Sequence, residues 1–251
     1  MKTLLAVGCS FTSEKFESTM HPEMDCSWPK WPEVLSKKLG YNVINLGRSG
    51  NSNDAIFKSA QDYIIDHKVD MICALWTQAT RLNIHDIENY NWMHSFSHIP
   101  EISKWFVDID KQKNFINIDK FDKLLSWKHT ALANEHLRYV YMLDQLGKYN
   151  NIPVYHMQGI RIYFAFTVPN DVRRKKKHKE YLNAVLESPY FDILDKQDNI
   201  WGWPFYKELG GDMPIGHAIW PNDNRIGKCD FHPNAYGHEI LADKYYELIH
   251  K

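Results

Sequence analysis

The sequence predicts an α/β protein in which a parallel sheet lies between two layers of helices. Three observations predict this fold: short apolar segments suited to buried strands, helical patterns between them, and the regular alternation of the two along the chain. Parallel neighbours in a sheet must be joined by crossovers, and helical crossovers cover the faces of the sheet. Ligands of such folds bind at the carboxyl ends of the strands, so reactive side chains are expected there.

Four short apolar segments match buried parallel strands, which are covered on both faces and therefore carry nearly continuous apolar sequence. Each segment ends at a glycine, a polar residue or a turn residue, as expected where a strand leaves the sheet. The predicted strands are Leu4–Val7, Val43–Leu46, Met71–Leu75 and Val154–Met157.

Helical patterns separate these strands. The first helix is predicted from Pro32 to Leu39 with a stop at Gly40, because proline suits the first turn of a helix and glycine the position after its end. The second lies in NSNDAIFKSAQDYIIDHK, behind Asn and Ser caps. A third is expected to end near Gly147, and the last follows Pro233. Their apolar stripes are Ile56, Ala60 and Ile64; Leu132, Tyr139, Leu143 and Leu146; and Leu241, Tyr245 and Leu248.

A chain of 251 residues with 44% hydrophobic composition can bury a large core, and we expect one domain over residues 1–251. Two long segments interrupt the alternation, at about 81–125 and about 160–228. Connections of that length without a core of their own are uncommon in compact domains. Both are therefore expected to form lids or side walls over the same edge of the sheet.

Composition and charge narrow the possible partners. The formal net charge of -1 provides no field to hold a polyanion, which argues against nucleic acid, and the basic segment RRKKKHK is interpreted as a solvated face. No apolar run approaches the roughly 20 residues of a membrane span, and the first residues lack the pattern of a signal peptide. We therefore expect a cytoplasmic protein without a membrane partner, or alternatively a component of a larger particle or assembly.

The four cysteines, Cys9, Cys26, Cys73 and Cys229, contain no close pair. This spacing fits reduced thiols better than a disulfide framework or a zinc site. His238 follows His232 by six residues, which places the two on different faces of a helix, so His238 is interpreted as a packing residue. The sequence predicts no metal and no cofactor.

Reactive side chains follow the first strand and precede the last helix. In LLAVGCSFT the chain leaves the strand through Gly8 and Cys9 to Ser10, and this turn either reverses the chain or presents a nucleophile. Near the C-terminus, DFHPNAYGH places Asp230 and His232 in a turn before a proline that fixes φ for the start of the helix. The pair is either catalytic or a constituent of the turn, and geometry decides between the two.

Two further turns follow the second and third strands. In NLGRSGNSND, Gly50 has no side chain to cover its backbone N–H, so a substrate could approach this group. The same sequence also suits an ordinary strand-to-helix turn without a ligand. In LWTQATR, Thr77 and Gln78 follow an apolar strand, where they either donate hydrogen bonds into a cleft or begin a loop.

Together these four stretches resemble the SGNH hydrolases, also called GDSL esterases, in the order of the family's blocks and over nearly the whole chain. The resemblance implies a three-layer α/β/α sandwich with a flavodoxin-like sheet. It also implies that Ser10 of GCSF is the nucleophile and that Gly50 of NLGRSGN contributes its N–H to the oxyanion hole. Asp230 and His232 of DFHPNAYGH would then be the acid and the base of the triad.

Three positions depart from the family's pattern. WTQA stands where the third block usually reads Gly-x-Asn-Asp; Gln78 is the nearest substitute, since its amide can also donate, and Thr77 is the next. Only one residue separates Asp230 from His232, whereas many members have two there. Cys9 replaces the Asp that commonly precedes the nucleophile. Cys9 is the less favoured nucleophile, because the residue just before the one that leaves the strand usually points back toward the sheet.

The resemblance implies acyl transfer through a covalent intermediate on Ser10, with His232 as general base and then general acid and with Asp230 orienting its ring. The N–H groups of Ser10 and Gly50, helped by Gln78, would stabilise the oxyanion.

Nine tryptophans exceed what a core of this size usually takes, which favours a carbohydrate O-acyl ester, such as an acetyl ester, as the substrate. Candidate substrate-binding residues are Asn51, Thr77, Trp201 and Trp203. The alternatives are a catalytically inactive binding or structural component of a larger assembly on the same fold, and an acyltransferase.

Overall fold

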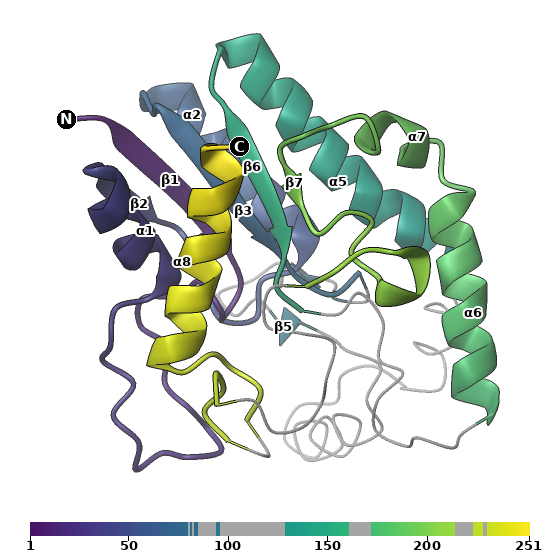
Figure 1. Cartoon of the computed structure of the whole chain (residues 1–251), viewed down its shortest axis with the longest axis horizontal. Helices are drawn as coiled ribbons and strands as arrows, with labels where there is room; N and C mark the ends of the chain where they lie inside the picture. Colours follow the sequence, from purple (N-terminus) through teal and green to yellow (C-terminus); the bar gives the residue numbers. More distant parts are fainter. Residues whose placement is uncertain are drawn as a thin grey trace.

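The computed structural model describes residues 1–79, 81, 83–84, 94–95, 129–160, 172–213, 223–227 and 230–251. Within these ranges, a five-stranded parallel sheet has helices on both faces, which confirms the predicted α/β/α architecture (Figure 1). The strands of the sheet are β1 (Thr3–Gly8), β2 (Asn42–Asn45), β3 (Met71–Trp76), β6 (Val154–Gln158) and β7 (Ile200–Trp201). The α-helices are α1 (Trp31–Leu39), α2 (Asn53–Asp66), α5 (His129–Asn150), α6 (Val172–Leu186), α7 (Phe191–Leu194) and α8 (Ala235–Ile249).

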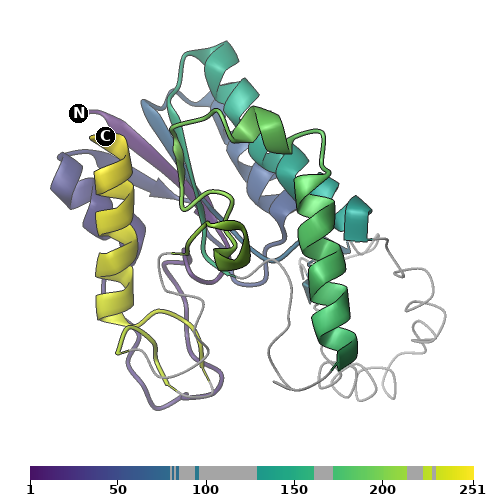
Figure 2. The ribbon, with the colours of Figure 1, turned by 45° about the vertical axis from the view of Figure 1, so that its right-hand side comes forward.

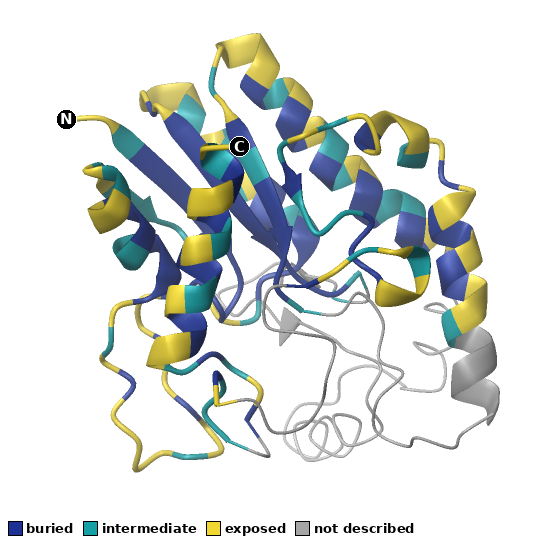
Figure 3. Ribbon diagram, viewed as in Figure 1, coloured by how far each residue is buried: buried dark blue, intermediate teal, exposed yellow. Residues whose placement is uncertain are grey.

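Strand β1 illustrates why the sheet needs apolar residues at consecutive positions. Successive side chains of a strand point to opposite faces. Leu5 and Val7 join the core cluster that contains side chains of α2, α5 and α6, whereas Leu4 and Ala6 join the cluster of α1 and α8. Both faces of β1 are therefore buried, as its dark blue colour in Figure 3 shows, and Figure 2 shows α8 and α6 on opposite sides of the sheet.

The strand order β2-β1-β3-β6-β7 is the flavodoxin-like order, as predicted. After β1 the chain passes through α1 to one neighbour, and after β2 it returns through α2 to the other neighbour. Because α1 and α2 cover opposite faces, the carboxyl ends of β1 and β3 form the switch point at which such folds bind ligands. Gly8 at the end of β1 is aligned with Leu75 of β3, so the residues that follow both strands emerge side by side.

One predicted helix boundary is wrong. Helix α5 does not end near Gly147 but continues to Asn150, and the chain then turns at Asn151, whose φ is 56°. A Cβ atom at position 147 would lie 2.2 Å from Cγ2 of Val154, so this glycine allows the helix to approach β6 closely. Helix α8 begins at Ala235, after Pro233 as predicted, with Asn234 as its N-cap.

Part of the second predicted insertion belongs to the core of the domain. Strand β7 pairs with β6 through Ile200 and His156, and α6 contributes the buried Tyr181 and Val185. A strand of two residues is too short to show an apolar period, which explains why the sequence pattern missed it. The segment also contains α7 and the 3₁₀ turn Lys207–Leu209.

The first predicted insertion lies outside the described residues, except for Arg81 and the short strands β4 (Asn83–Ile84) and β5 (His94–Ser95), which pair with each other. The basic segment 173–179 forms part of α6, but the side chains of 173–177 lie outside the described set. Within the described ranges, no helix combines the length and the apolar character needed to cross a bilayer.

Among the residues that the structure describes, three histidines are buried. Burial lowers the pKa of His136 to about 3 and also lowers the pKa of His156. Burial, together with the positive charge of Lys30, lowers the pKa of His238 to about 3. All three imidazoles are therefore neutral near pH 6, whereas each would titrate near pH 6.5 in the unfolded chain.

We expect the protein to lose stability as the pH falls below about 6.5, because the unfolded chain then binds protons that the folded protein does not. Each buried histidine lowers the free energy of unfolding by about 1.4 kcal/mol per pH unit until its folded pKa is reached. Urea unfolding between about pH 7.5 and pH 5 measures this slope. His156→Gln should reduce the slope and the exposed control His67→Gln should not; equal slopes in the two variants would contradict the expectation.

Candidate active site

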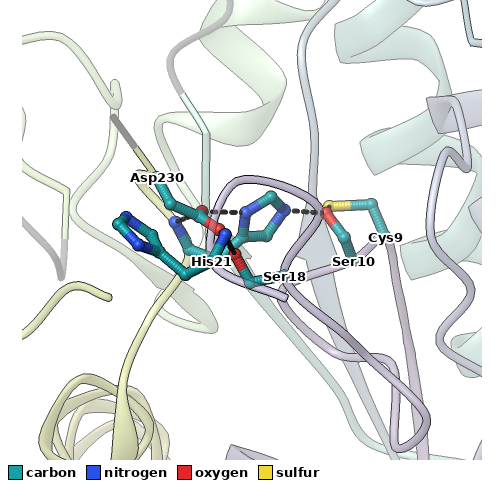
Figure 4. A network of polar contacts seen from close by, with 6 residues as sticks. Cys9, Ser10, Ser18, His21 and Asp230 are labelled. Atoms are coloured by element: carbon teal, nitrogen blue, oxygen red, sulfur yellow. Dashed lines mark hydrogen bonds and ion pairs between the residues drawn. The ribbon is translucent and has the colours of Figure 1, made fainter. Parts of the chain in front are cut away.

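Ser10, His232 and Asp230 form a continuous hydrogen-bonded chain at the carboxyl edge of the sheet. The Oγ of Ser10 lies 2.8 Å from Nε2 of His232, and Nδ1 of the same ring lies 2.5 Å from Oδ1 of Asp230. Figure 4 shows Asp230 and Ser10 on either side of this ring. The first contact joins residues 222 positions apart in the sequence, so the fold rather than local sequence brings them together.

A tight turn presents Ser10 directly after β1. The N–H groups of Thr12 and Ser13 both donate to the carbonyl of Cys9, at 2.9 and 3.1 Å, which closes the chain around Ser10. Thr12 is fully buried and accepts a hydrogen bond from Nε1 of Trp31 at 3.1 Å. The turn is therefore held by its backbone and by Thr12, and not by the hydroxyl of Ser10.

Gly8 and Gly47 leave the space that Thr12 occupies. A Cβ atom on Gly8 would lie 2.0 Å from Oγ1 of Thr12, and one on Gly47 would lie 2.6 Å from Cβ of the same residue. Asn45 adds a hydrogen bond from its Nδ2 to the carbonyl of Thr12 at 2.8 Å. The glycines of GCSFT and NLGRSG thus bring the ends of β1 and β2 together behind the turn that contains Ser10.

The loop before α8 presents Asp230 and His232. Its two arms pair antiparallel, with a bridge between Arg225 and Pro233 and a bond from the N–H of Ile226 to the carbonyl of His232. A further bond, from the N–H of Asn234 to the carbonyl of Asn224, extends the pairing. This pairing fixes the positions of the Asp230 and His232 side chains. The family usually has two residues between the acid and the base, whereas only one lies between them here. Residues 223–227 carry no signal in the sequence that would have predicted this support.

Ser18, which no pattern in the sequence indicated, lies against Asp230 in Figure 4. Its hydroxyl donates to Oδ2 of Asp230 at 2.5 Å and accepts from the backbone N–H of His21 at 2.9 Å. Burial alone would raise the pKa of Asp230, but the hydrogen bonds from His232 and Ser18 outweigh it and lower the pKa to about 2. Asp230 is therefore an ionised carboxylate at neutral pH.

Two phenylalanines of the same loop hold the imidazole of His232. The ring of Phe16 stacks on it, with centroids 4.2 Å apart, and the ring of Phe11 meets it edge-on at 5.2 Å. Both phenylalanines are buried, whereas the side chain of His232 is 29% exposed. The ring is thus fixed in orientation while remaining open to a substrate.

The predicted oxyanion donors surround the same turn. The loop that contains Gly50 rests on β1, because the carbonyl of Gly8 accepts from the N–H of Arg48 at 3.2 Å and from Nδ2 of Asn51 at 3.0 Å. Gly50 itself adopts a left-handed conformation with φ of 86°. Among the described residues, neither the N–H of Ser10 nor that of Gly50 has an acceptor, so both can donate to a ligand.

Gln78 and Thr77 follow β3 beside this turn. Both are buried, and Oε1 of Gln78 and Oγ1 of Thr77 have no hydrogen-bond partner within the described part of the chain. The backbone of Thr77 is fixed by Asn53, which accepts from its N–H at 2.9 Å, and by Nε2 of Gln158, which donates to its carbonyl at 2.9 Å. Both side chains therefore keep hydrogen-bonding capacity at the switch point.

The two predicted tryptophans pack against the domain. Trp201 lies in β7 beside the cluster of α1 and α8, under the ammonium of Lys244 at 5.7 Å. Trp203 packs on Phe205, with ring centroids 5.3 Å apart, and donates to Asp195 at 2.9 Å. Neither contacts the triad through an interaction among the described residues, in contrast to Asn51, which touches Gly8.

Cys9 and His238 lie beside the triad without joining it. The Sγ of Cys9 is 4.0 Å from the Oγ of Ser10, and the residue is fully buried in the cluster of α1 and α8. Nδ1 of His238 accepts from the backbone N–H of Trp31 at 3.2 Å, which is a packing role. Cys9, Cys26 and Cys73 are free thiols, whereas Cys229 lies outside the described residues, among which no cluster of metal ligands occurs.

No protein-family model matches this sequence, and no curated protein does either. Solved structures similar to this chain include TesA, at 11% identity and a TM-score of 0.48, over 99% of this chain and 98% of TesA. Axe2, an acetylxylan esterase from Geobacillus stearothermophilus, has 14% identity and a TM-score of 0.43, over 99% and 94%. The esterase EstA from Pseudoalteromonas sp. has 10% identity and a TM-score of 0.45, over 100% and 97%. No activity carries over at these values, so the chemistry is inferred from the side chains of this protein.

Proposed function

We propose that this protein is a serine hydrolase of the SGNH type that cleaves a carbohydrate O-acyl ester by acyl transfer through Ser10. The observation that carries the proposal is the hydrogen-bonded chain from Ser10 through His232 to Asp230. A serine hydroxyl is a weak nucleophile unless a base takes its proton, and an imidazole within hydrogen-bond reach is such a base.

In the first step, Oγ of Ser10 attacks the carbonyl carbon of the ester while its proton passes to Nε2 of His232. The tetrahedral oxyanion accepts hydrogen bonds from the N–H groups of Ser10 and Gly50 and from the side chain of Gln78. The C–O bond to the alcohol then breaks, and His232 returns the proton to the leaving oxygen. Asp230 keeps the ring in the required tautomer and stabilises the imidazolium that forms in between.

In the second step, water attacks the acyl group on Ser10, and His232 again acts as the base. The proton passes to Oγ of Ser10 as the carboxylic acid leaves, which restores the enzyme. The partly exposed His232 ring admits water to this position, and Phe11 and Phe16 prevent the ring from rotating away.

A fluorophosphonate probe tests the proposal, because it forms a covalent adduct only with an activated serine. We expect one adduct, located on Ser10 by peptide mass spectrometry and absent from Ser10→Ala. Cys9→Ala is the matched control, since it removes the neighbouring thiol and should retain labelling. Absence of an adduct from the folded protein would instead support the catalytically inactive binding component.

A further inference from the structure

A small pocket lies at the carboxyl edge of the sheet, between the first turns of α2 and the first half of α5. Its volume is about 110 Å³. This is below the roughly 300–1,000 Å³ of sites that enclose a whole drug-sized ligand, so it has room for one small ring or headgroup. Five of its lining side chains are Asp54 of α2, Arg81 after β3, and Glu135, His136 and Tyr139 of α5.

Two hydrogen bonds connect the wall of this pocket to the nucleophile turn. Nη1 of Arg81 donates to the carbonyl of Asn51 at 3.4 Å, and Nδ2 of Asn51 donates to the carbonyl of Gly8 at 3.0 Å. Gly8 precedes Ser10 by two residues. Asn53, which also lines the pocket, bonds both backbone groups of Thr77. The pocket therefore adjoins the switch point at which Ser10 and the oxyanion donors lie.

The lining does not suit the acyl chain of an ester. Among its described lining residues, Ala79 is the one aliphatic side chain, and two carboxylates and a guanidinium face the same small volume. An alkyl chain there would remove water from these charges without replacing the lost hydrogen bonds, which is costly. A ligand with charge of only one sign is also poorly suited, because the lining carries charges of both signs.

The hydrogen-bonding capacity of the lining matches neighbouring hydroxyl groups. Carboxylates only accept and a guanidinium only donates, whereas a hydroxyl can do both. Among the described residues, the guanidinium of Arg81 makes one hydrogen bond, at 3.4 Å, so most of its donors are available. Asp54 accepts from Ser52, and Glu135 accepts from Arg138 at 3.2 Å and Tyr139 at 3.3 Å, which fixes both carboxylates in place.

We propose that this pocket receives the hydroxyl-bearing ring of the alcohol part of the ester, with Asp54 and Glu135 accepting from its hydroxyls and Arg81 donating to its oxygens. The inference rests on the proposed esterase function of Ser10 and names the site that selects its substrate. It assigns to Asp54, Arg81 and Glu135 a role in specificity and none in the chemical step.

Paired substrates test this assignment. We expect Arg81→Ala and Asp54→Asn to lower kcat/KM for a mono-O-acetylated methyl pyranoside by about tenfold or more, the value of a hydrogen bond to a charged group. p-Nitrophenyl acetate carries the same acyl group on an alcohol without hydroxyls, and its hydrolysis should change by less than about twofold. Asp66→Asn is the matched control, because Asp66 is an exposed carboxylate at the other end of α2. Thermal unfolding confirms that each variant is folded.

Three outcomes would overturn the assignment: equal losses on both substrates, no loss on the sugar ester, or a larger loss on an octanoyl ester than on the sugar ester. Titration of the acetylated pyranoside into Ser10→Ala protein, followed by NMR or calorimetry, tests the pocket without catalysis. Binding that Arg81→Ala weakens supports the pocket even if the wild-type protein hydrolyses neither ester, a result that would refute only the esterase function. Binding that is absent, or that Arg81→Ala leaves unchanged, refutes the pocket.

Discussion

Replacement of Ser10 by alanine is expected to lower kcat for ester hydrolysis by on the order of 10⁶-fold, because the nucleophile of a triad acts as a unit with its base. The substitution removes one atom, Oγ, which is the atom that would form the acyl-enzyme bond. His232 and Asp230 remain in place, since Phe11 and Phe16 hold the ring and the antiparallel loop arms hold the backbone. Without a hydroxyl to deprotonate, the imidazole has no reaction to assist.

The same substitution should leave the protein folded. The nucleophile turn is closed by the N–H groups of Thr12 and Ser13, and neither bond involves the side chain of Ser10. The lost hydrogen bond to His232 lies at a partly open site, so the expected change in the free energy of unfolding is about 1 kcal/mol or less. Far-UV circular dichroism and urea unfolding measure this change beside the kinetic assay.

Ser13→Ala is the control for this experiment, because Ser13 lies in the same turn and is similarly buried. Among the described residues, its hydroxyl makes no hydrogen bond to Ser10, His232 or Asp230, so the variant should keep nearly full activity on an aryl acetate. Retained activity in Ser10→Ala, or an equal loss in folded Ser13→Ala, would remove Ser10 from its assigned role.

The expectation that Ser10, His232 and Asp230 lie together came from the resemblance to the SGNH hydrolases, and the element patterns only placed each residue at the end of a strand or before a helix. Ser10 follows a fully apolar strand, and Asp230 and His232 precede a helix with a regular apolar stripe. In a parallel sheet of flavodoxin-like order, the residue after β1 must emerge at the switch point. The strand order therefore explains the position of Ser10, whereas the position of its partner 222 residues away depends on the loop before α8.

The residues that support the triad could not be predicted in this way. Ser18 and Phe16 belong to a loop without periodicity, and only the folded path of that loop brings them to Asp230 and His232. The edge strand β7 was not predicted for a related reason, because a strand of two residues is too short to show an alternation of apolar and polar side chains. Gly147 was misread because a glycine that ends a helix and one that allows close packing look the same in a sequence.

Replacement of Asp230 by asparagine is expected to lower kcat by about 10⁴-fold with little change in KM. Oδ1 of Asp230 accepts from Nδ1 of His232, which leaves Nε2 unprotonated toward Ser10. An amide can present its NH₂ group to Nδ1 and so favour the opposite tautomer, in which Nε2 carries the proton and cannot act as a base. The amide also lacks the charge that stabilises the imidazolium.

The pH dependence distinguishes this role from a structural one. The pKa of Asp230 is about 2, so the carboxylate is ionised at every pH from 6 to 9. The deficit of Asp230→Asn should therefore persist from pH 6 to pH 9, because neither Asn nor ionised Asp titrates there. A deficit that disappears anywhere in this range would contradict the role assigned to Asp230.

Ser18→Ala separates the orientation of the carboxylate from its charge. The variant keeps the charge of Asp230 but removes the donor to Oδ2, and we expect the pKa of Asp230 to rise because burial is then less well offset. One neutral donor to a charged group corresponds to a loss of about tenfold in kcat, which Ser18→Thr should largely restore. If Asp230→Asn lost no more activity than Ser18→Ala, the charge of Asp230 would contribute nothing beyond its geometry, and the triad would reduce to Ser10 and His232.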